Sequence, residues 1–298
     1  MAAIAPSGQA DLREPAGWRR TKNRIATILM YAAFVLAIVP LVFVLYTVIA
    51  KGASVISWQF LTGSIPPSVL PASVGGMGPA ILGTIEITAL ASVIAVPLGV
   101  LGAIYLNEYG GEKKNLLARF LGFLADVMTG VPSIIMGLFI FAIWVLHFGF
   151  SGLAGALALG CLMLPIVIRS TEEMLKLVPD SLREGSYALG ASKSRVTLTV
   201  VLPAALGGIV SGVLLAIARA AGETAPLLFT ILTVTEANPN VFSGANTSLP
   251  SQIFVNASSP YTGAQARGWG AALTLIAIAF ILMIAARLVT ARFARYAR

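Results

Sequence analysis

Six long apolar segments constrain this chain more than any other feature of its sequence. A helix that crosses a membrane needs about 20 mostly apolar residues, and six segments reach that length. Of the 298 residues, 57% are hydrophobic and only 11% are charged, which fits a chain with lipid as its solvent. The sequence therefore predicts an all-α integral membrane protein with six transmembrane helices. These spans lie at about residues 25–50, 81–107, 120–146, 153–172, 206–234 and 269–290.

The six segments divide the chain simply. Residues 1–24 form a predicted cytoplasmic N-terminal tail, and residues 25–298 form one transmembrane domain. The first segment is too long for the apolar part of a signal peptide, and Lys51 follows it directly without a small-residue cleavage site. We therefore expect the first segment to be an uncleaved span.

The basic residues are distributed unevenly between the loops. The chain has 20 Lys and Arg against 12 Asp and Glu, a net charge of +8 that in a soluble protein would suggest nucleic acid as a partner. Here the basic residues fall almost entirely on the side that holds both termini, while Lys51 and Arg267 are the exceptions and Arg219 lies within the fifth segment. Because cytoplasmic loops carry such an excess, we expect both termini in the cytoplasm and no nucleic-acid partner.

Few residues could bind a metal or a cofactor. The chain has one cysteine, Cys161, and one histidine, His147, which argues against disulfides, zinc and haem. No glycine-rich phosphate-binding loop of the P-loop type is present. We therefore expect no metal, no cofactor and no bound ATP on this chain itself.

The loop between the fourth and fifth segments, residues 177–205, is too long and too patterned to be only a connector. It predicts two short helices. Ser181 and Glu184 have the spacing of a capping box at the start of the first helix, and Gly190 can supply the left-handed position that ends it. A second helix is predicted to begin near Ser192 and to run toward Pro203.

This loop resembles the cytoplasmic EAA signature of ABC importer permeases. The match consists of Glu184-Gly185-Ser186, then Gly190, then Leu202-Pro203 after the expected spacing, with Gly-Ser in place of Ala-Ala. The resemblance implies that the loop docks on an ATPase subunit, whereas the plainer interpretation is an amphipathic helix packed on the span ends. The residues predicted to form this ATPase-coupling loop are Ser181, Glu184, Gly185, Ser186, Ala188, Gly190, Leu202 and Pro203.

Further blocks resemble the PstA-type permease subunits of phosphate-specific ABC importers. Residues 222–228 (GETAPLL), which follow Arg219, are the most specific of them. The remaining blocks are residues 97–99 (PLG), 104–110 (IYLNEYG), 132–134 (PSI), 137–139 (GLF), 165–169 (PIVIR) and 174–179 (MLKLVP). Together they cover most of the chain from the second to the fifth predicted span.

The resemblance implies a type I ABC importer permease fold in the bacterial plasma (inner) membrane. A second, PstC-type permease would complete the translocation path, and a cytoplasmic dimer of PstB-type ATPase subunits would use ATP and Mg. An extracytoplasmic PstS-type protein would deliver phosphate. The chain itself would be a non-catalytic subunit in a heterodimeric permease.

A buried charge gives phosphate independent support. An arginine in the middle of a span costs about 2.5–3.5 kcal/mol to insert and needs a compensating role. Arg219 is such a residue, and Glu223 lies four positions on, on the same helix face. A guanidinium can offer two parallel donors to an oxyanion, and Thr224 adds a hydroxyl nearby. The alternative is structural, with the two charges neutralising each other and fixing helix packing.

Arg169 repeats the pattern near the cytoplasmic end of the fourth segment, with Glu172 and Glu173 three and four positions on. We predict Arg169 and Glu172 as further substrate-path residues. The alternative is that Arg169 reaches the membrane surface and is solvated there.

Two other functions are compatible with the sequence. The nearer is the same kind of importer for another oxyanion, such as sulfate or molybdate. The more distant is a secondary transporter driven by an ion gradient, although the paired repeats typical of that class are not seen in the sequence.

Overall fold

The computed structural model describes residues 17–110, 115–236 and 238–296, and within these ranges all regular secondary structure is helical. This confirms the predicted all-α class. The chain divides into two units at residues 49 and 50. The first unit contains most of α1 (Gly17–Gly52), which begins within the predicted tail, so that residues 17–24 are helical.

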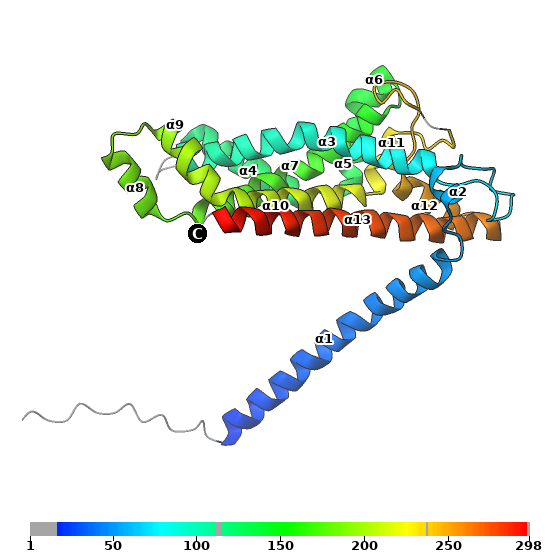
Figure 1. The fold of residues 1–298 in the computed structure, drawn as a ribbon, viewed down its shortest axis with the longest axis horizontal. Coiled ribbons are helices and arrows are strands. Elements are labelled where there is room, and N and C mark those ends of the chain that lie inside the picture. Colours follow the sequence, from blue (N-terminus) through cyan, green and yellow to red (C-terminus); the bar gives the residue numbers. More distant parts are fainter. Residues whose placement is uncertain (1–16, 111–114, 237, 297–298) are drawn as a thin grey trace, which may run out of the picture. The chain divides into compact units, whose positions relative to one another are not determined.

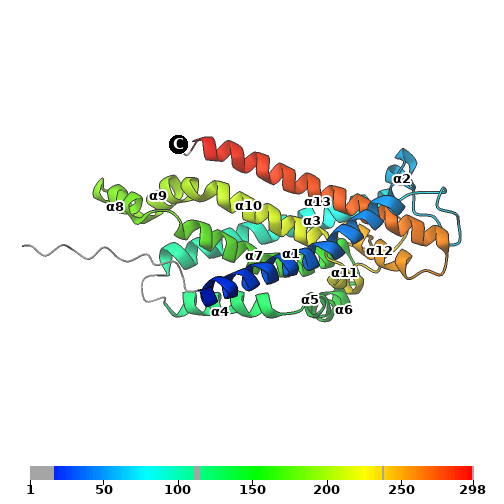
Figure 2. The same ribbon diagram turned by 90° about the horizontal axis from the view of Figure 1, so that it is seen from below.

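The second unit is a bundle of long helices. In Figures 1 and 2, α3, α7, α10 and α13 run side by side, with α8 and α9 at one end and α2 and α12 at the other. The long helices are α3 (Gly78–Ile104), α7 (Gly152–Lys176), α10 (Leu202–Ala221) and α13 (Thr262–Tyr296). The shorter ones are α2 (Trp58–Thr62), α4 (Leu116–Gly130), α5 (Ser133–Ile140), α6 (Leu146–Phe148), α8 (Asp180–Ala188), α9 (Lys193–Val196), α11 (Ala225–Thr230) and α12 (Leu249–Ala257).

Three π-helical segments join some of these helices without a break. They are η1 (Tyr105–Tyr109) after α3, η2 (Phe141–Val145) after α5 and η3 (Thr197–Val201) between α9 and α10. Because π-turns inside helices are uncommon and often lie at functional sites, it is notable that η1 and η3 both lie at the end of the bundle that carries α8.

Small residues allow the central helices to pack closely. The core between α3, α7, α10 and α11 contains Ala91, Ala95, Ala156 and Ala220 together with Leu159. Short side chains at a helix contact let the backbones approach, which is the usual way that helices associate in lipid. This packing holds α3 against α7 along the length of the bundle.

Five helices in the described ranges are long and apolar enough to cross a membrane, and a bent pair makes a sixth if it counts as one span. The bent pair lies at the predicted span of residues 120–146: α4 and the helix from Ser133 to Phe148 meet at 109°. Val131 has an extended backbone at the bend, because the proline that follows disfavours the helical conformation. The sequence predicted a span at this position but not its bend.

The predicted fifth span at residues 206–234 was misplaced. The helix starts at Lys193, runs through η3 and α10, and ends at Ala221. Pro226 has no NH to donate to the Gly222 carbonyl, and its ring would clash with that carbonyl in a continuous helix. The structure has a full break before the separate helix α11.

One arginine at the far end of the bundle from α8 has a structural role that the sequence did not reveal. Arg267 is completely buried and donates to the backbone carbonyls of Leu70 and Pro71 at 2.9 and 3.0 Å. Its other terminal nitrogen lies 3.3 and 3.4 Å from the carbonyls of Pro67 and Ser68. Arg267 therefore fastens the loop after α2 to the start of α13.

Candidate functional site

The break between α10 and α11 positions the most specific of the predicted site residues. Pro226 and Leu227 are buried, and α11 packs against α5 and α7. A Cβ atom added at Gly137 of α5 would lie only 2.5 Å from the Cα atom of Pro226. Only glycine fits in that space, and its lack of a side chain lets α5 approach α11 closely. This contact fixes where the helix resumes after the break.

Arg219 lies on the last turn of α10, directly before this break. Its side chain is 70% exposed, and its Nε atom lies 3.9 Å from Oε1 of Glu223, whose side chain is 21% exposed. The two side chains form an ion pair, but the distance between these atoms is too long for a hydrogen bond. No hydrogen bond from another side chain or backbone group in the described ranges engages the Arg219 guanidinium, so its donors face outward from this chain.

Thr224 lies between Glu223 and α11 as the N-cap residue of that helix. Its hydroxyl makes no capping hydrogen bond, although threonine commonly caps a helix in this way. Arg219, Glu223 and Thr224 thus lie at one helix break, but α10 ends at Ala221, so Glu223 does not share a helix face with Arg219 as the spacing predicted.

Arg169 has a different environment. One terminal nitrogen donates to Oε2 of Glu172 at 2.6 Å, and the other donates to the carbonyl of Gly122 at 2.9 Å and to the carboxylate of Asp126. Glu172 is almost fully buried and also pairs with Lys176 at 2.8 Å. These contacts fasten α7 to α4 through side chains whose donors are already used.

The sequence missed the partner that Arg169 finds on α4. Glu173, expected from the spacing to join the cluster, is instead exposed to solvent, and Asp126 on α4 takes part. Asp126 could have been suspected because a carboxylate within an apolar segment usually needs a partner. Nothing in the spacing of the two residues along the chain identifies Arg169 as that partner.

The predicted coupling loop forms α8, a tight turn and then the continuous helix that begins with α9. Gly190 has φ +79° and ends α8 as predicted, since glycine adopts the left-handed conformation without strain. Ser192 is the N-cap of α9, also as predicted. The continuous helix carries Leu202 and Pro203 in the first turn of α10, where a proline is tolerated.

The predicted capping box was wrong. Pro179 is the N-cap of α8, and Ser181 lies inside the first turn without a capping bond. Proline has a fixed φ that suits the residue before a helix, so α8 starts at Asp180, two residues earlier than the serine pattern suggested. Glu184 consequently points into solvent rather than back to the serine backbone.

The helix α8 is largely polar but exposes several apolar side chains on its surface. The helix buries none of its own residues, while Leu182 is 47% exposed, Tyr187 41% and Leu189 at its end 90%. Gly185 and Ala188 lie among these side chains with no atom of the chain near a Cβ added at Gly185. Exposed leucine and tyrosine side chains around small residues form a surface suited to another protein chain.

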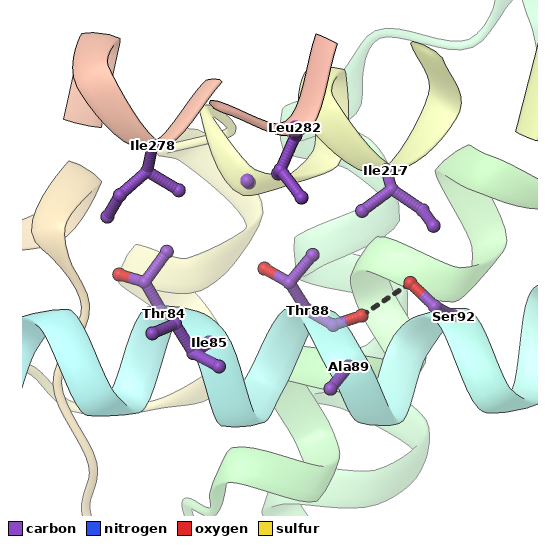
Figure 3. A pocket seen from close by; sticks show the side chains of 9 residues that line it. Thr84, Ile85, Thr88, Ala89, Ser92, Ile217, Ile278 and Leu282 are labelled. Atoms are coloured by element: carbon purple, nitrogen blue, oxygen red, sulfur yellow. Dashed lines mark hydrogen bonds between the residues drawn. The ribbon is translucent and has the colours of Figure 1, made fainter. Parts of the chain in front are cut away.

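A cavity of about 360 Å³ lies between α3, α10 and α13, and Figure 3 shows the side chains around it. Its walls are formed mainly by aliphatic side chains, including Ile217, Ile278 and Leu282. Of the hydroxyls on α3, those of Thr84 and Ser92 donate to the backbone carbonyls of Ala80 and Thr88, and only that of Thr88 has no partner among the described residues. No charged side chain lines the cavity, so it is unsuited to a phosphate ion.

No group of three His, Cys, Asp or Glu side chains that could hold a metal ion lies in the described part of the chain. The absence of a cofactor on this chain stays a prediction.

Comparison with known proteins agrees with this architecture. Residues 95–295 match the family described as "Binding-protein-dependent transport system inner membrane component". The chain is 44% identical over 278 residues to the phosphate transport system permease protein PstA 1 of Mycobacterium tuberculosis (strain ATCC 25618 / H37Rv), covering 91% of this chain and 88% of that protein. It is 42% identical over 286 residues to the phosphate transport system permease protein PstA of Yersinia pestis, covering 94% of each.

A solved structure has the same fold. A chain of the MetNI methionine ABC transporter in an inward-facing conformation matches with a TM-score of 0.58 and 19% identity, over 73% of this chain and 95% of that one. The family match covers more than half of the sequence, and the PstA relatives cover nearly all of it. The chain therefore belongs to the family of binding-protein-dependent transport system inner membrane components.

Proposed function

We propose that this chain is a permease subunit of an ATP-driven importer of inorganic phosphate. The observation that carries the proposal is the 42–44% identity, over about nine-tenths of the chain, to proteins named phosphate transport system permeases. Such a subunit performs no covalent chemistry itself. ATP and Mg are used by a separate ATPase.

The Arg219 site supports an anionic substrate. Its guanidinium is 70% exposed and held by one long ion pair, so its parallel N–H donors remain available to a tetrahedral oxyanion. Glu223 can pair with Arg219 when no anion is present. A passing anion can then replace Glu223 as the partner of the guanidinium. The substrate path is therefore proposed to include Arg219, Glu223 and Thr224.

The contacts of Arg169 argue for a different role in the same machine. Its donors are engaged by Glu172, Asp126 and a backbone carbonyl. A phosphate ion would have to displace these groups before it could bind. Arg169 and Glu172 are therefore proposed to fix the helices that form the walls of the path and not to bind phosphate themselves.

The proposed orientation places the α8 end of the bundle in the cytoplasm of a bacterial cell. Most described basic residues of the second unit gather at that end, on α4, α7, α8, α9 and the last turns of α13, which agrees with the positive-inside rule. The exposed surface of α8 then faces an ATPase dimer. A second permease subunit completes the path, and an extracytoplasmic phosphate-binding protein delivers the ion at the α2 and α12 end.

The experiment that tests this function is uptake of labelled inorganic phosphate into vesicles that contain the complete complex, with and without ATP. ATP-dependent uptake that excess unlabelled phosphate suppresses and sulfate does not is the expected result. Suppression by sulfate or molybdate would favour the broader oxyanion importer. Uptake that follows an imposed ion gradient without ATP would favour a secondary transporter and overturn the proposal.

A further inference from the structure

The helix α8 is attached to the rest of the bundle in an unusual way. It contributes no buried side chain, so apolar packing does not hold it in place. The apolar cluster beneath it is formed by the end of α7 and by α9, η3 and α10, with Leu175, Val196 and Val201 at its centre. Whatever fixes the angle of α8 must therefore be polar, apart from the chain connections at its two ends.

One side chain of α8 turns inward and supplies these polar contacts. Arg183 is only 14% exposed. It donates to the carbonyls of Val178 and Leu175 at 2.5 and 2.9 Å, which ties α8 to the end of α7. It also pairs with the exposed Asp180 at 3.1 Å within the same helix.

The remaining contact of Arg183 reaches a helix that is distant in sequence. Its second terminal nitrogen lies 3.0 Å from Oε1 of Glu108, whose side chain is 5% exposed and lies on η1 at the end of α3. A second contact joins the same two regions, since Nζ of Lys193 on α9 lies 5.3 Å from the ring centre of Tyr109. The helices α8 and α9 thus contact η1 at two adjacent residues, one through an ion pair and one through a cation–π contact.

At its other end, α3 is fastened to the opposite side of the bundle. The backbone NH of Leu249, at the start of α12, donates to Oγ1 of Thr84 at 2.7 Å. A Cβ atom at Gly83 would lie 2.0 Å from the carbonyl oxygen of Thr247, so the backbones touch there. In Figure 1, α3 runs the length of the bundle between these two attachments.

We infer that the Glu108–Arg183 ion pair, supported by Tyr109 and Lys193, connects α8 mechanically to α3. A displacement of α8 by its partner then moves α3, and the contact of Thr84 transmits that movement to α12 at the far end. This connection adds to the direct connection of α8 along the chain to α7 and α10. A buried, hydrogen-bonded ion pair suits this task because its geometry is directional and separating it is costly. Glu108 and Arg183 are positioning residues that touch neither phosphate nor ATP. This inference rests on the proposed function, in which α8 receives the ATPase.

The test uses the complete complex in vesicles and measures labelled phosphate uptake and ATP hydrolysis in the same sample. The variant Glu108→Gln removes the charge while keeping the shape. We expect roughly tenfold less phosphate imported per ATP hydrolysed, with the ATPase still bound and active, because force on α8 no longer reaches α3 fully. A purely structural role would lower the amount of assembled complex and leave that ratio unchanged, which would overturn the inference.

The matched control is Glu173→Gln, the same substitution on an exposed residue of α7 without an ion pair in the described part of the chain. It should keep the wild-type ratio. A double-mutant cycle adds a second criterion: if Glu108 and Arg183 act as one connection, Glu108→Gln combined with Arg183→Gln should lose no more than Arg183→Gln alone. Losses that simply add would contradict the connection.

A further variant decides the question if Glu108→Gln fails to assemble. Tyr109 is 40% exposed, so Tyr109→Leu should fold normally and remove only the cation–π contact. A reduced phosphate-to-ATP ratio in this variant supports the inference, and a wild-type ratio overturns it. Failure of the proposed function gives a different result, because the wild-type complex itself would then show no ATP-dependent phosphate uptake.

Discussion

Two arginines with nearly the same sequence signature have opposite environments in this protein. Arg169 and Glu172 are three residues apart within α7, whereas Arg219 and Glu223 are four residues apart at the end of α10 and just beyond it. The first pair is only part of a network that includes Asp126, a backbone carbonyl and Lys176. The second is one contact of 3.9 Å on an exposed side chain.

This difference separates two uses of a charge in a membrane helix. An arginine whose donors all have partners holds helices together and would lose those contacts by binding an anion. An arginine with free donors at a helix break can bind and release one. The i, i+3 and i, i+4 spacing cannot distinguish these uses, because it describes one helix and the decisive partners lie on another.

Replacing the free arginine should give the largest effect. For Arg219→Gln we expect phosphate uptake to fall by roughly 100-fold, since two charge-assisted hydrogen bonds to the ion are lost. The exposed side chain makes no contact that the fold needs, so the thermal stability and assembly of the complex should stay near wild type. Uptake at the wild-type rate would show that Arg219 is a packing charge and would remove the contrast between the two sites.

Replacing the engaged arginine should act on stability instead. Arg169→Gln removes one charged partner of the buried Glu172 and the contact of Arg169 with Asp126, and we expect a loss of about 2 kcal/mol in stability. A lower unfolding temperature of the purified chain in detergent is the measurement. If that temperature is unchanged while uptake by the assembled complex is abolished, Arg169 belongs to the substrate path and the comparison fails.

The position of the helix break can be tested through its packing. Gly137→Ala places a methyl group against the backbone of Pro226, and we expect it to cost about 1–3 kcal/mol because neither backbone can move freely. Uptake should fall as α11 shifts away from α5. The control is Gly122→Ala on α4, where no atom lies within 4 Å of the new Cβ, and equal effects of both variants would contradict the packing argument.

The smallest effect is expected on the exposed helix α8. Gly185→Ala adds a methyl group to open space and should stabilise the isolated helix by up to about 1 kcal/mol, because glycine is a poor helix former. Uptake and unfolding temperature should both stay within experimental scatter of wild type. A strong loss of ATPase binding would show instead that the partner approaches Gly185 too closely for any side chain, which would sharpen the assignment of the docking surface.

Much of this fold was predictable because a membrane helix can be identified from the length and apolarity of one continuous stretch of sequence. Length and apolarity predicted the helical class and most span positions, and Gly190 predicted the end of α8 because only a few residues adopt a left-handed backbone easily. The unpredicted bend of the third span and the early end of the fifth both occur at a proline. Pro132 and Pro226 were visible in the sequence, but the size of a proline break depends on what packs beside it.

Sequence alone predicted that this chain is helical and apolar enough to cross a membrane several times, and which residues have the spacing of one helix face. It also carried the signature of the α8 loop and the block around Arg219. Only the tertiary structure decided which charges are engaged, because Asp126 meets Arg169 and Glu108 meets Arg183 across contacts between helices. Periodicity describes what one helix presents, whereas a side chain's partner depends on how separate helices pack in space.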